Sequence, residues 1–283
     1  MSDNSFKDQV TVITGAGGTL CSAIALHLAK KGAKVALLGR TREKLEITAQ
    51  KITSAGGNCM ICTCDVTDQE SVEKAAEKIL TEWGACRFLL NGAGGNNINA
   101  MTTTFCFDPL ELSDVRPEEM RGFFHLSMDA FERVLKTNTM GTVIPTQIFA
   151  RSMAINGGGV ILNFASMNTY RPLTRVAPYA MSKAAISNWT QWLATYLAPA
   201  NIRVNAIAPG FFVNERSRQY LGTPESGLTQ RGKNVIAHTP MKRFGEACDL
   251  FGAVSYLLSD EDAGFVTGIT LPVDGGFLSH SGV

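Results

Sequence analysis

The stretch QVTVITGAGGTLCSAIALHLAKKG, residues 9–32, decides how this chain folds. Its first part, VTVIT, is a short β-branched run, and its last part, LCSAIALHLAK, has apolar residues at helical spacing. Between them lies GAGGTL, whose glycines let the backbone turn sharply from a strand into a helix. The free N–H groups at the start of such a helix can receive a phosphate. The stretch therefore predicts a strand–turn–helix unit with an anion site at its turn.

The same alternation of strand and helix continues along the chain. Segments with helical spacing separate further apolar runs at 34–39, 58–66, 87–94, 159–165, 201–210 and 268–276. Alternating units with short connections favour a parallel sheet covered by helices on both faces. No Pro/Ser-rich linker divides the 283 residues, so we expect one α/β domain with a doubly wound parallel sheet, spanning 1–283.

Three regions depart from this alternation. Residues 95–127 have weak periodicity, two prolines and several phenylalanines, which predicts a long irregular insertion. Residues 211–244 form a second irregular region, which we interpret as a substrate lid. Between them, residues 128–153 predict a helix that is interrupted around Asn138–Gly141 and again disturbed at Pro145.

The composition excludes several classes of partner. A formal net charge of +1 and the lack of a basic tract argue against nucleic acid and against a membrane surface. No apolar segment reaches the roughly 18 residues that a membrane span requires. Seven cysteines without a secretory signal fit a reducing compartment, so we expect a cytoplasmic protein. We also expect no metal, because Cys59, Cys62 and Cys64 lie in a strand-like run with neither a second CxxC nor a His pair nearby.

The segment SMNTYRPLTRVAPYAMSK, residues 166–183, carries the residues best suited to chemistry. Ser166 follows a buried strand, and ligands of parallel sheets bind beyond the carboxyl ends of the strands. Tyr179 and Lys183 are four residues apart on a predicted helix, so both side chains can approach one ligand. A nearby ammonium favours the phenolate of a tyrosine. A Tyr–Lys pair at this spacing is also common on ordinary amphipathic surfaces, so the pair alone does not decide the function.

Other strand ends indicate a dinucleotide. Dinucleotide-binding folds that use NAD usually have an acidic residue after the second strand, where it accepts from the ribose 2′-OH. This chain has Arg40 there, and an arginine can pair with the 2′-phosphate of NADP. Arg40 therefore favours NADP, unless it is only a solvated loop residue. Asp65 follows the third strand, where it either accepts from an adenine amino group or caps the next helix. The small turn Asn91–Gly92–Ala93 leaves room for a flat ring against the backbone.

Together these motifs resemble the short-chain dehydrogenase/reductase family over essentially the full chain. The glycine turn after Thr14, the NGAG at 91–94, IRVNAIAPG at 202–210 and the closing VDGG occur in the family's order. The resemblance implies a Rossmann-type, three-layer fold, a bound NAD(P) and a catalytic group of Asn138, Ser166, Tyr179 and Lys183. Tyr179 would be the general acid/base, Lys183 would bind the nicotinamide ribose and lower the pKa of the phenol, Ser166 would bind the substrate oxygen, and Asn138 would hold a relay water.

The same resemblance implies the residues that line the cofactor. They are Gly15, Gly17, Gly18, Thr19, Leu20, Arg40, Asp65, Val66, Asn91, Gly92, Ala93, Tyr179, Lys183, Pro209, Gly210 and Phe212. The chain departs from the family pattern at Thr19 and Cys21, where glycines are usual, and at Asn214, where a threonine is usual.

The insertion, with SMNTYRPLTR, APGFF and HTPMKRFGE, resembles the D-mannonate oxidoreductase (fructuronate reductase) branch. This implies a sugar-acid substrate and favours NAD, against the indication from Arg40. Arg175 is the candidate for the substrate carboxylate, with Asn96 and Asn168, and then Arg171, Asn97 and His238, as further polar candidates. The alternatives are a reductase of another ketone, such as 5-ketogluconate or a neutral compound, and a non-catalytic nucleotide-binding regulator. The resemblance also implies a homo-oligomer, a tetramer or dimer, although the segment WTQWLATYL would suit a monomer's core almost as well.

Overall fold

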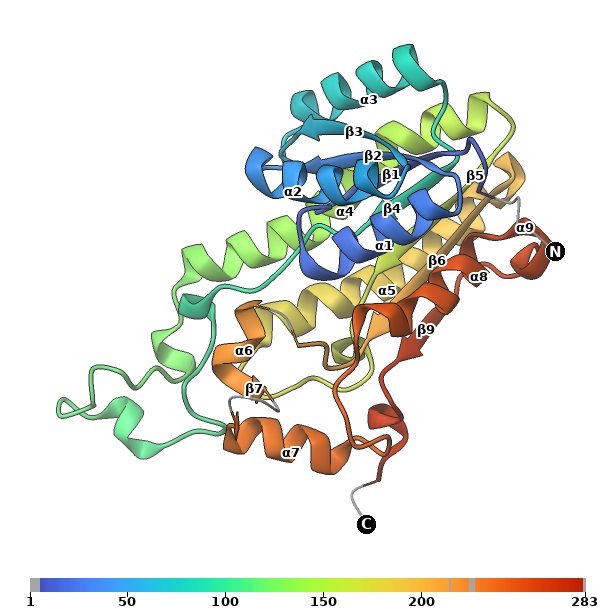
Figure 1. The fold of residues 1–283 in the computed structure, drawn as a ribbon. Helices are drawn as coiled ribbons and strands as arrows, with labels where there is room; N and C mark the ends of the chain where they lie inside the picture. The colour runs from blue at the N-terminus through green and yellow to red at the C-terminus, as the bar shows by residue number, and fades with distance from the viewer. Residues whose placement is uncertain (1–5, 214, 224–226, 282–283) are drawn as a thin grey trace.

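The computed structural model describes residues 6–213, 215–223 and 227–281. At its centre lies a seven-stranded sheet in the order β3-β2-β1-β4-β5-β6-β9, with every neighbouring pair parallel (Figure 1). The strands are β1 (Val10–Thr14), β2 (Lys34–Gly39), β3 (Asn58–Thr63), β4 (Phe88–Asn91), β5 (Gly159–Phe164), β6 (Ile202–Pro209) and β9 (Thr270–Val273). The order reverses between β1 and β4, which confirms the predicted doubly wound Rossmann fold and marks where its crevice opens.

Helices cover both faces of this sheet. On one face lie α1 (Thr19–Lys30), α2 (Arg42–Ser54) and α8 (Phe251–Leu258), and on the other lie α3 (Gln69–Trp83), α4 (Met128–Ile155) and α5 (Ala177–Leu197). Successive strand residues alternate between the two cores: Ile13 belongs to the first and Val12 to the second. The inner strands β1, β4 and β5 are thus buried on both sides, as their continuous apolar sequences predict, whereas the edge strands β3 and β9 are partly exposed.

The predicted interruption of the fourth helix is wrong, because α4 runs unbroken from Met128 to Ile155 with Pro145 inside it. Asn138 and Gly141 are buried in this helix. A Cβ on Gly141 would come 2.8 Å from Val66, so this glycine serves a close approach to the turn after β3. Packing of α4 against the sheet and against α5 therefore outweighs the local tendency to break.

The insertion, residues 95–127, is irregular as predicted. It contains only the single-turn helices η1 (Ile98–Ala100), η2 (Pro109–Leu112) and η3 (Phe123–His125). Its two ends meet, because the Ser127 N–H donates to the Asn99 carbonyl at 3.1 Å. In Figure 1 the insertion projects from the side of the sheet to which the strands point.

The region 211–244 is more regular than the sequence indicates. Its described residues form α6 (Glu215–Leu221), the short antiparallel pair β7 (Gly222–Thr223) and β8 (Gly227–Leu228), and α7 (Gln230–His238). Leu221, Val235 and Phe244 make a small core that holds these pieces together. The remaining elements are η4 (Met167–Thr169), η5 (Ala198–Ala200), η6 (Ala247–Leu250), α9 (Asp260–Ala263) and η7 (Phe277–Ser279).

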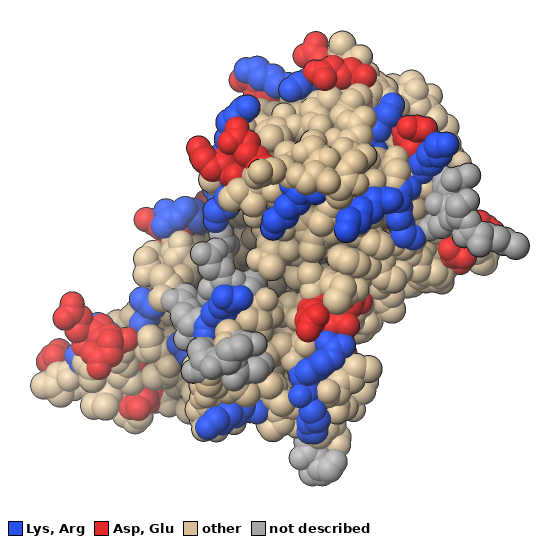
Figure 2. All heavy atoms as spheres, viewed as in Figure 1, with Lys and Arg blue, Asp and Glu red and all other residues tan. Residues whose placement is uncertain are grey.

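The surface carries no extended field of one sign. Figure 2 shows lysine and arginine interspersed with aspartate and glutamate over the visible face, in agreement with the near-zero formal charge. Within the described residues, no helix combines the length and the apolar character that crossing a bilayer requires.

Candidate active site

The glycine turn after β1 forms one wall of the crevice. Gly15 has a φ of 66°, and a Cβ there would come 2.8 Å from Ala93 in the turn after β4. Gly18 precedes α1, whose start has neither a side-chain cap nor an acidic residue in its first turn. A helix start that lacks a protein cap offers its N–H groups and positive dipole end to a pyrophosphate. The turn therefore fits a dinucleotide, and exposed Thr19 and partly buried Leu20 stand at its edge.

The turn after β4 lies directly against this glycine turn. The Ala93 N–H donates to the Thr14 hydroxyl at 3.1 Å, which fixes the two turns together. Gly92 has no side chain to meet Cys21 of α1, whose sulfur lies 2.2 Å from where a Cβ on Gly92 would stand. The cysteine that replaces a usual glycine is thus accommodated by a glycine opposite it. Asn91 turns its side chain inward to Thr146 and Asn163, so only its backbone can face a ligand in the crevice.

The second and third strands bring Arg40 and Asp65 together at the rim. Partial burial acts to raise the pKa of Asp65, but two hydrogen bonds from Thr67 and the charges of Arg40 and Lys136 together outweigh it, so the pKa is lowered. The cap of α3 is Asp68, not Asp65. Val66 is buried beside α4. At the end of β6, Gly210 packs against Asp274 and the ring of Phe212 joins the core, while Asn214 lies outside the described residues.

Ser166, Tyr179 and Lys183 converge at the carboxyl end of β5. The Lys183 ammonium donates to the Phe164 carbonyl at 2.5 Å and lies 5.6 Å from the centre of the Tyr179 ring. Burial lowers the pKa of Lys183 to about 8. Burial also disfavours the charged form of Tyr179, so it raises the pKa of this phenol, whereas a hydrogen bond with Ser166 lowers it. The phenol is therefore held protonated and beside a hydroxyl in this arrangement.

Asn138 of α4 connects the start of the insertion with α5. Its Oδ1 accepts from the Gly95 N–H at 2.8 Å, and its Nδ2 donates to the Gly95 carbonyl at 3.0 Å and to the Ser182 hydroxyl at 2.8 Å. The side chain is fully buried. Asn138 thus joins the start of the insertion to the residue that precedes Lys183, and Ser182 is a member of this arrangement that the sequence reasoning missed.

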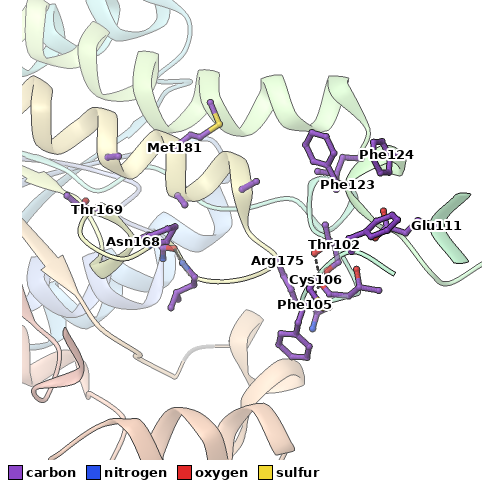
Figure 3. Close-up of a pocket in the computed structure, with 18 residues that line it drawn as sticks. Thr102, Phe105, Cys106, Glu111, Phe123, Phe124, Asn168, Thr169, Arg175 and Met181 are labelled. Atoms are coloured by element: carbon purple, nitrogen blue, oxygen red, sulfur yellow. Dashed lines mark hydrogen bonds between the residues drawn. The ribbon is translucent and has the colours of Figure 1, made fainter. Parts of the chain in front are cut away.

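Asn168 and Arg175 line a cavity of about 730 Å³ between the insertion and the start of α5. Figure 3 shows Phe123 and Phe124 of the insertion on one side of it, and Asn168 and Met181 on the other. Asn168 is buried, and its amide binds Ser166 and the Leu173 N–H, so it orients Ser166. Neither Ser166 nor Tyr179 lines this cavity. The cavity lies beside the candidate catalytic residues, to which Asn168 connects it through its hydrogen bond to Ser166.

The other polar candidates have structural partners. Asn96 accepts from the Asn97 N–H, and Asn97 caps η1. Arg171 donates to the His280 carbonyl, and the His238 ring meets the His280 ring edge to face at 5.6 Å. These contacts attach Arg171 and His238 to the C-terminal segment and do not bring them to Arg175.

Comparison with known proteins identifies the family. The sequence model described as short chain dehydrogenase matches residues 9–221. A solved structure from Haemophilus influenza, provisionally assigned as a D-mannonate oxidoreductase and containing NAD, is 40% identical, with a TM-score of 0.93 over 100% of this chain and 99% of that chain. An uncharacterized oxidoreductase of Bacillus subtilis strain 168, UxuB, is 42% identical over 97% of this chain and 96% of its own length.

More distant relatives act on different alcohols. The 7alpha-hydroxysteroid dehydrogenase of Escherichia coli strain K12 is 31% identical over 97% of this chain and 96% of its own length. Other relatives are named as a glucose 1-dehydrogenase and an NAD-dependent glycerol dehydrogenase, so the relatives of this chain differ in substrate. The chain belongs to the short-chain dehydrogenase family and is an oxidoreductase of alcohol and ketone groups.

Proposed function

We propose that the protein interconverts a sugar acid of the D-mannonate/D-fructuronate type with NAD as coenzyme. The observation that carries this proposal is Arg175, a partly buried arginine four residues before Tyr179. Its Nε donates to the Thr102 carbonyl at 2.7 Å, while its two Nη groups have no acceptor among the described residues. A guanidinium held in this way suits a carboxylate. The assignment of the Haemophilus relative supports the same substrate class.

NAD is favoured over NADP by the surroundings of Arg40. This arginine faces the carboxylate of Asp65, which offsets the positive charge that a ribose 2′-phosphate would require. The Haemophilus relative was solved with NAD bound. The glycine turn, the helix start and the turn after β4 would hold the dinucleotide, whose nicotinamide supplies or accepts the hydride.

The residues around Tyr179 would manage the proton. For reduction, the protonated phenol would donate to the substrate oxygen while Ser166 holds that oxygen by a hydrogen bond. Lys183 would bind the ribose hydroxyls and stabilise the phenolate that remains. Burial raises the pKa of the Tyr179 phenol, which fits its role as proton donor when the reaction runs as ketone reduction.

For Asn138 we propose a positioning role in place of direct water binding. Its amide already makes three hydrogen bonds, to both backbone groups of Gly95 and to Ser182. Both hydrogens of its Nδ2 are used, so the amide has no free donor for a relay water and only one lone pair of Oδ1 is left to accept from it. Asn138 would instead keep α5, with Tyr179 and Lys183, in register with the entrance of the insertion.

The test is a substrate panel read by nicotinamide absorbance. The purified protein is offered D-fructuronate, tagaturonate, 5-ketogluconate and a neutral ketone, each with NADH and with NADPH. The proposal predicts the highest kcat/KM for D-fructuronate with NADH. Turnover of the neutral ketone alone would refute the substrate and retain the reaction class.

A second candidate substrate is a bulky apolar ketone. The cavity beside the catalytic group is lined by Phe105, Phe107, Phe123 and Phe124, and the Escherichia coli relative is a steroid dehydrogenase. A 7-oxo steroid therefore belongs in the panel as the neutral ketone. A higher kcat/KM for the steroid than for D-fructuronate would establish this second function.

A further inference from the structure

Glu111 is a buried acid of the insertion, and one of its two oxygens lacks a partner. The residue is only 4% exposed, and it lines the cavity between the insertion and α5. Its Oε1 accepts from the Asp108 N–H at 3.4 Å, as part of the capping box of η2. Its Oε2 has no hydrogen-bond partner among the described residues. A buried carboxylate oxygen without a donor is costly, so a ligand that supplies a donor would be held there.

Uncovered phenylalanine rings surround this carboxylate. A Cβ on Gly122 would overlap the Glu111 carboxyl group, so the carboxylate rests directly on the backbone that leads into Phe123. The rings of Phe123 and Phe124 meet edge to face at 5.5 Å, and those of Phe124 and Phe107 do so at 6.3 Å. All three rings line the cavity, and each residue is more than half exposed. The faces of such rings attract an ammonium ion.

The insertion carries more acids than cations. Residues 95–127 include five Asp or Glu residues and two arginines. Both of these, Arg116 and Arg121, donate to backbone carbonyls of the insertion, and no ion pair between described residues includes Glu111. Figure 2 shows acidic side chains over the projecting end that the insertion forms in Figure 1. The charge of this segment therefore favours a cation over an anion.

We propose that this cavity is a binding site for an organic ammonium ion, an apolar amine whose N–H donates to Glu111. Its hydrocarbon body would pack against the phenylalanine rings, and its charge would compensate the buried carboxylate. An anion would be repelled by Glu111, and a neutral hydrocarbon would leave Oε2 without a donor. The proposal is independent of the sugar-acid function and adds a second site to the protein.

Arg175, the other charged residue of the lining, is directed elsewhere. Its Nε donates to the Thr102 carbonyl at 2.7 Å, and its guanidinium lies 5.8 Å from the centre of the Phe105 ring. In Figure 3, Arg175 and Glu111 lie on opposite sides of Thr102. An ammonium ion beside Glu111 is therefore compatible with the cation at the other end of the cavity.

A ligand in this cavity would leave the catalytic group free. The lining residues from α5 recur every three or four positions and so share one face of the helix: Ala177, Ala180, Met181 and Ala184. Tyr179 and Lys183 lie on another face of the same helix and are absent from the lining. Asn168, which lines the cavity and binds Ser166, is the one link from the lining to the catalytic group that the hydrogen bonds of the described residues show.

The site is tested by calorimetry on the purified protein with three probes of equal length, n-hexylammonium, n-hexanol and n-hexanoate. We expect n-hexylammonium to bind most tightly, and Glu111→Gln to raise its Kd by about 10- to 100-fold with little change for n-hexanol. Glu118→Gln, which removes an exposed acid of the same insertion, is the matched control and should change neither Kd. Tyr179→Phe should bind n-hexylammonium as the wild type does. Should Glu111→Gln fail to fold, Phe124→Leu serves in its place and should reduce the preference for n-hexylammonium over n-hexanol.

Four results would overturn the site. They are no binding of n-hexylammonium at millimolar concentration, equal Kd values for n-hexylammonium and n-hexanol in the wild type, an equal loss in Glu118→Gln, and a loss in Tyr179→Phe. The third would reduce the effect to the general charge of the insertion, and the fourth would place the amine at the catalytic group. None of these measurements involves turnover, so the site and the sugar-acid function can fail separately.

Discussion

The cofactor side and the substrate side of the crevice are built in different ways. On the cofactor side, short turns directly after β1 and β4 touch through glycines, and a Cβ at Gly15 or Gly92 would meet the opposite turn or helix. On the substrate side, contacts join residues far apart in the chain, such as Arg175 and Thr102, which are 73 positions apart. Local sequence therefore sets the cofactor side, whereas packing between distant segments sets the substrate side.

The largest expected effect falls on Tyr179, which lies where the two sides meet. Tyr179→Phe removes the proton donor and should lower kcat by about 10²- to 10⁴-fold, with an almost unchanged Kd for the cofactor. Steady-state kinetics and cofactor titration check this. Tyr196→Phe, an exposed position on the same helix, is the control and should keep full activity. Turnover that survives in Tyr179→Phe would refute the assigned acid.

A substitution of Lys183 measures how much its buried charge costs the folded protein. Burial lowers its folded pKa to about 8 from 10.5, so the unfolded chain binds more protons between these values and stability rises with pH there. Below pH 8 the buried charge costs about 3 kcal/mol. Relative to the wild type, Lys183→Met should therefore be stabilised most at pH 7, with a difference that shrinks toward pH 10. Denaturant unfolding without cofactor measures this difference, and a pH-independent result would contradict it.

The close packing of the cofactor side depends on a glycine at position 92, next to Cys21 of α1. Gly92→Ala would place a Cβ 2.2 Å from the Cys21 sulfur and should destabilise the protein by about 1–3 kcal/mol. Cys21→Ala in the same chain should restore most of that loss. Gly252→Ala in α8, where no atom lies within 4 Å, is the matched control and should be tolerated. Thermal unfolding checks all three, and a lack of rescue would show that the strain arises elsewhere.

The smallest effect concerns the coenzyme preference at the rim. Arg40→Ala should weaken NADPH about tenfold more than NADH if the guanidinium reaches the 2′-phosphate despite Asp65. Arg42→Ala, an exposed neighbour paired with Glu46, should not change the ratio. Equal losses for the two coenzymes would leave Arg40 with no part in selectivity. Fluorescence titration of the two reduced coenzymes gives the ratio.

The sequence was informative wherever a residue's role depends on its immediate neighbours. The strands, the turn from Gly15 to Gly18 and the Tyr179–Lys183 helix follow from patterns a few residues long, and the structure contains these elements. The doubly wound parallel sheet followed from the alternation of strands and helices and from the family resemblance, and the structure adds its strand order.

The sequence failed where distant packing decides. The unbroken α4 could not be predicted from Gly141 and Pro145 alone, since its stability comes from the sheet and from α5. The helix α7 was missed because QRGKNVIAH is short and contains Gly232.

The closed base of the insertion has a consequence for how such enzymes diversify. Asn99 and Ser127 are joined by a backbone hydrogen bond, and Gly95 is held by Asn138. The segment between residues 99 and 127 is thus attached at a fixed pair of anchor points, and beyond them it contacts Arg175 and packs through Ala100 against Ala130 and Val134 of α4. Recombination could therefore replace this segment as a unit. Such a replacement would alter the choice of substrate while the proposed proton-transfer residues keep their positions.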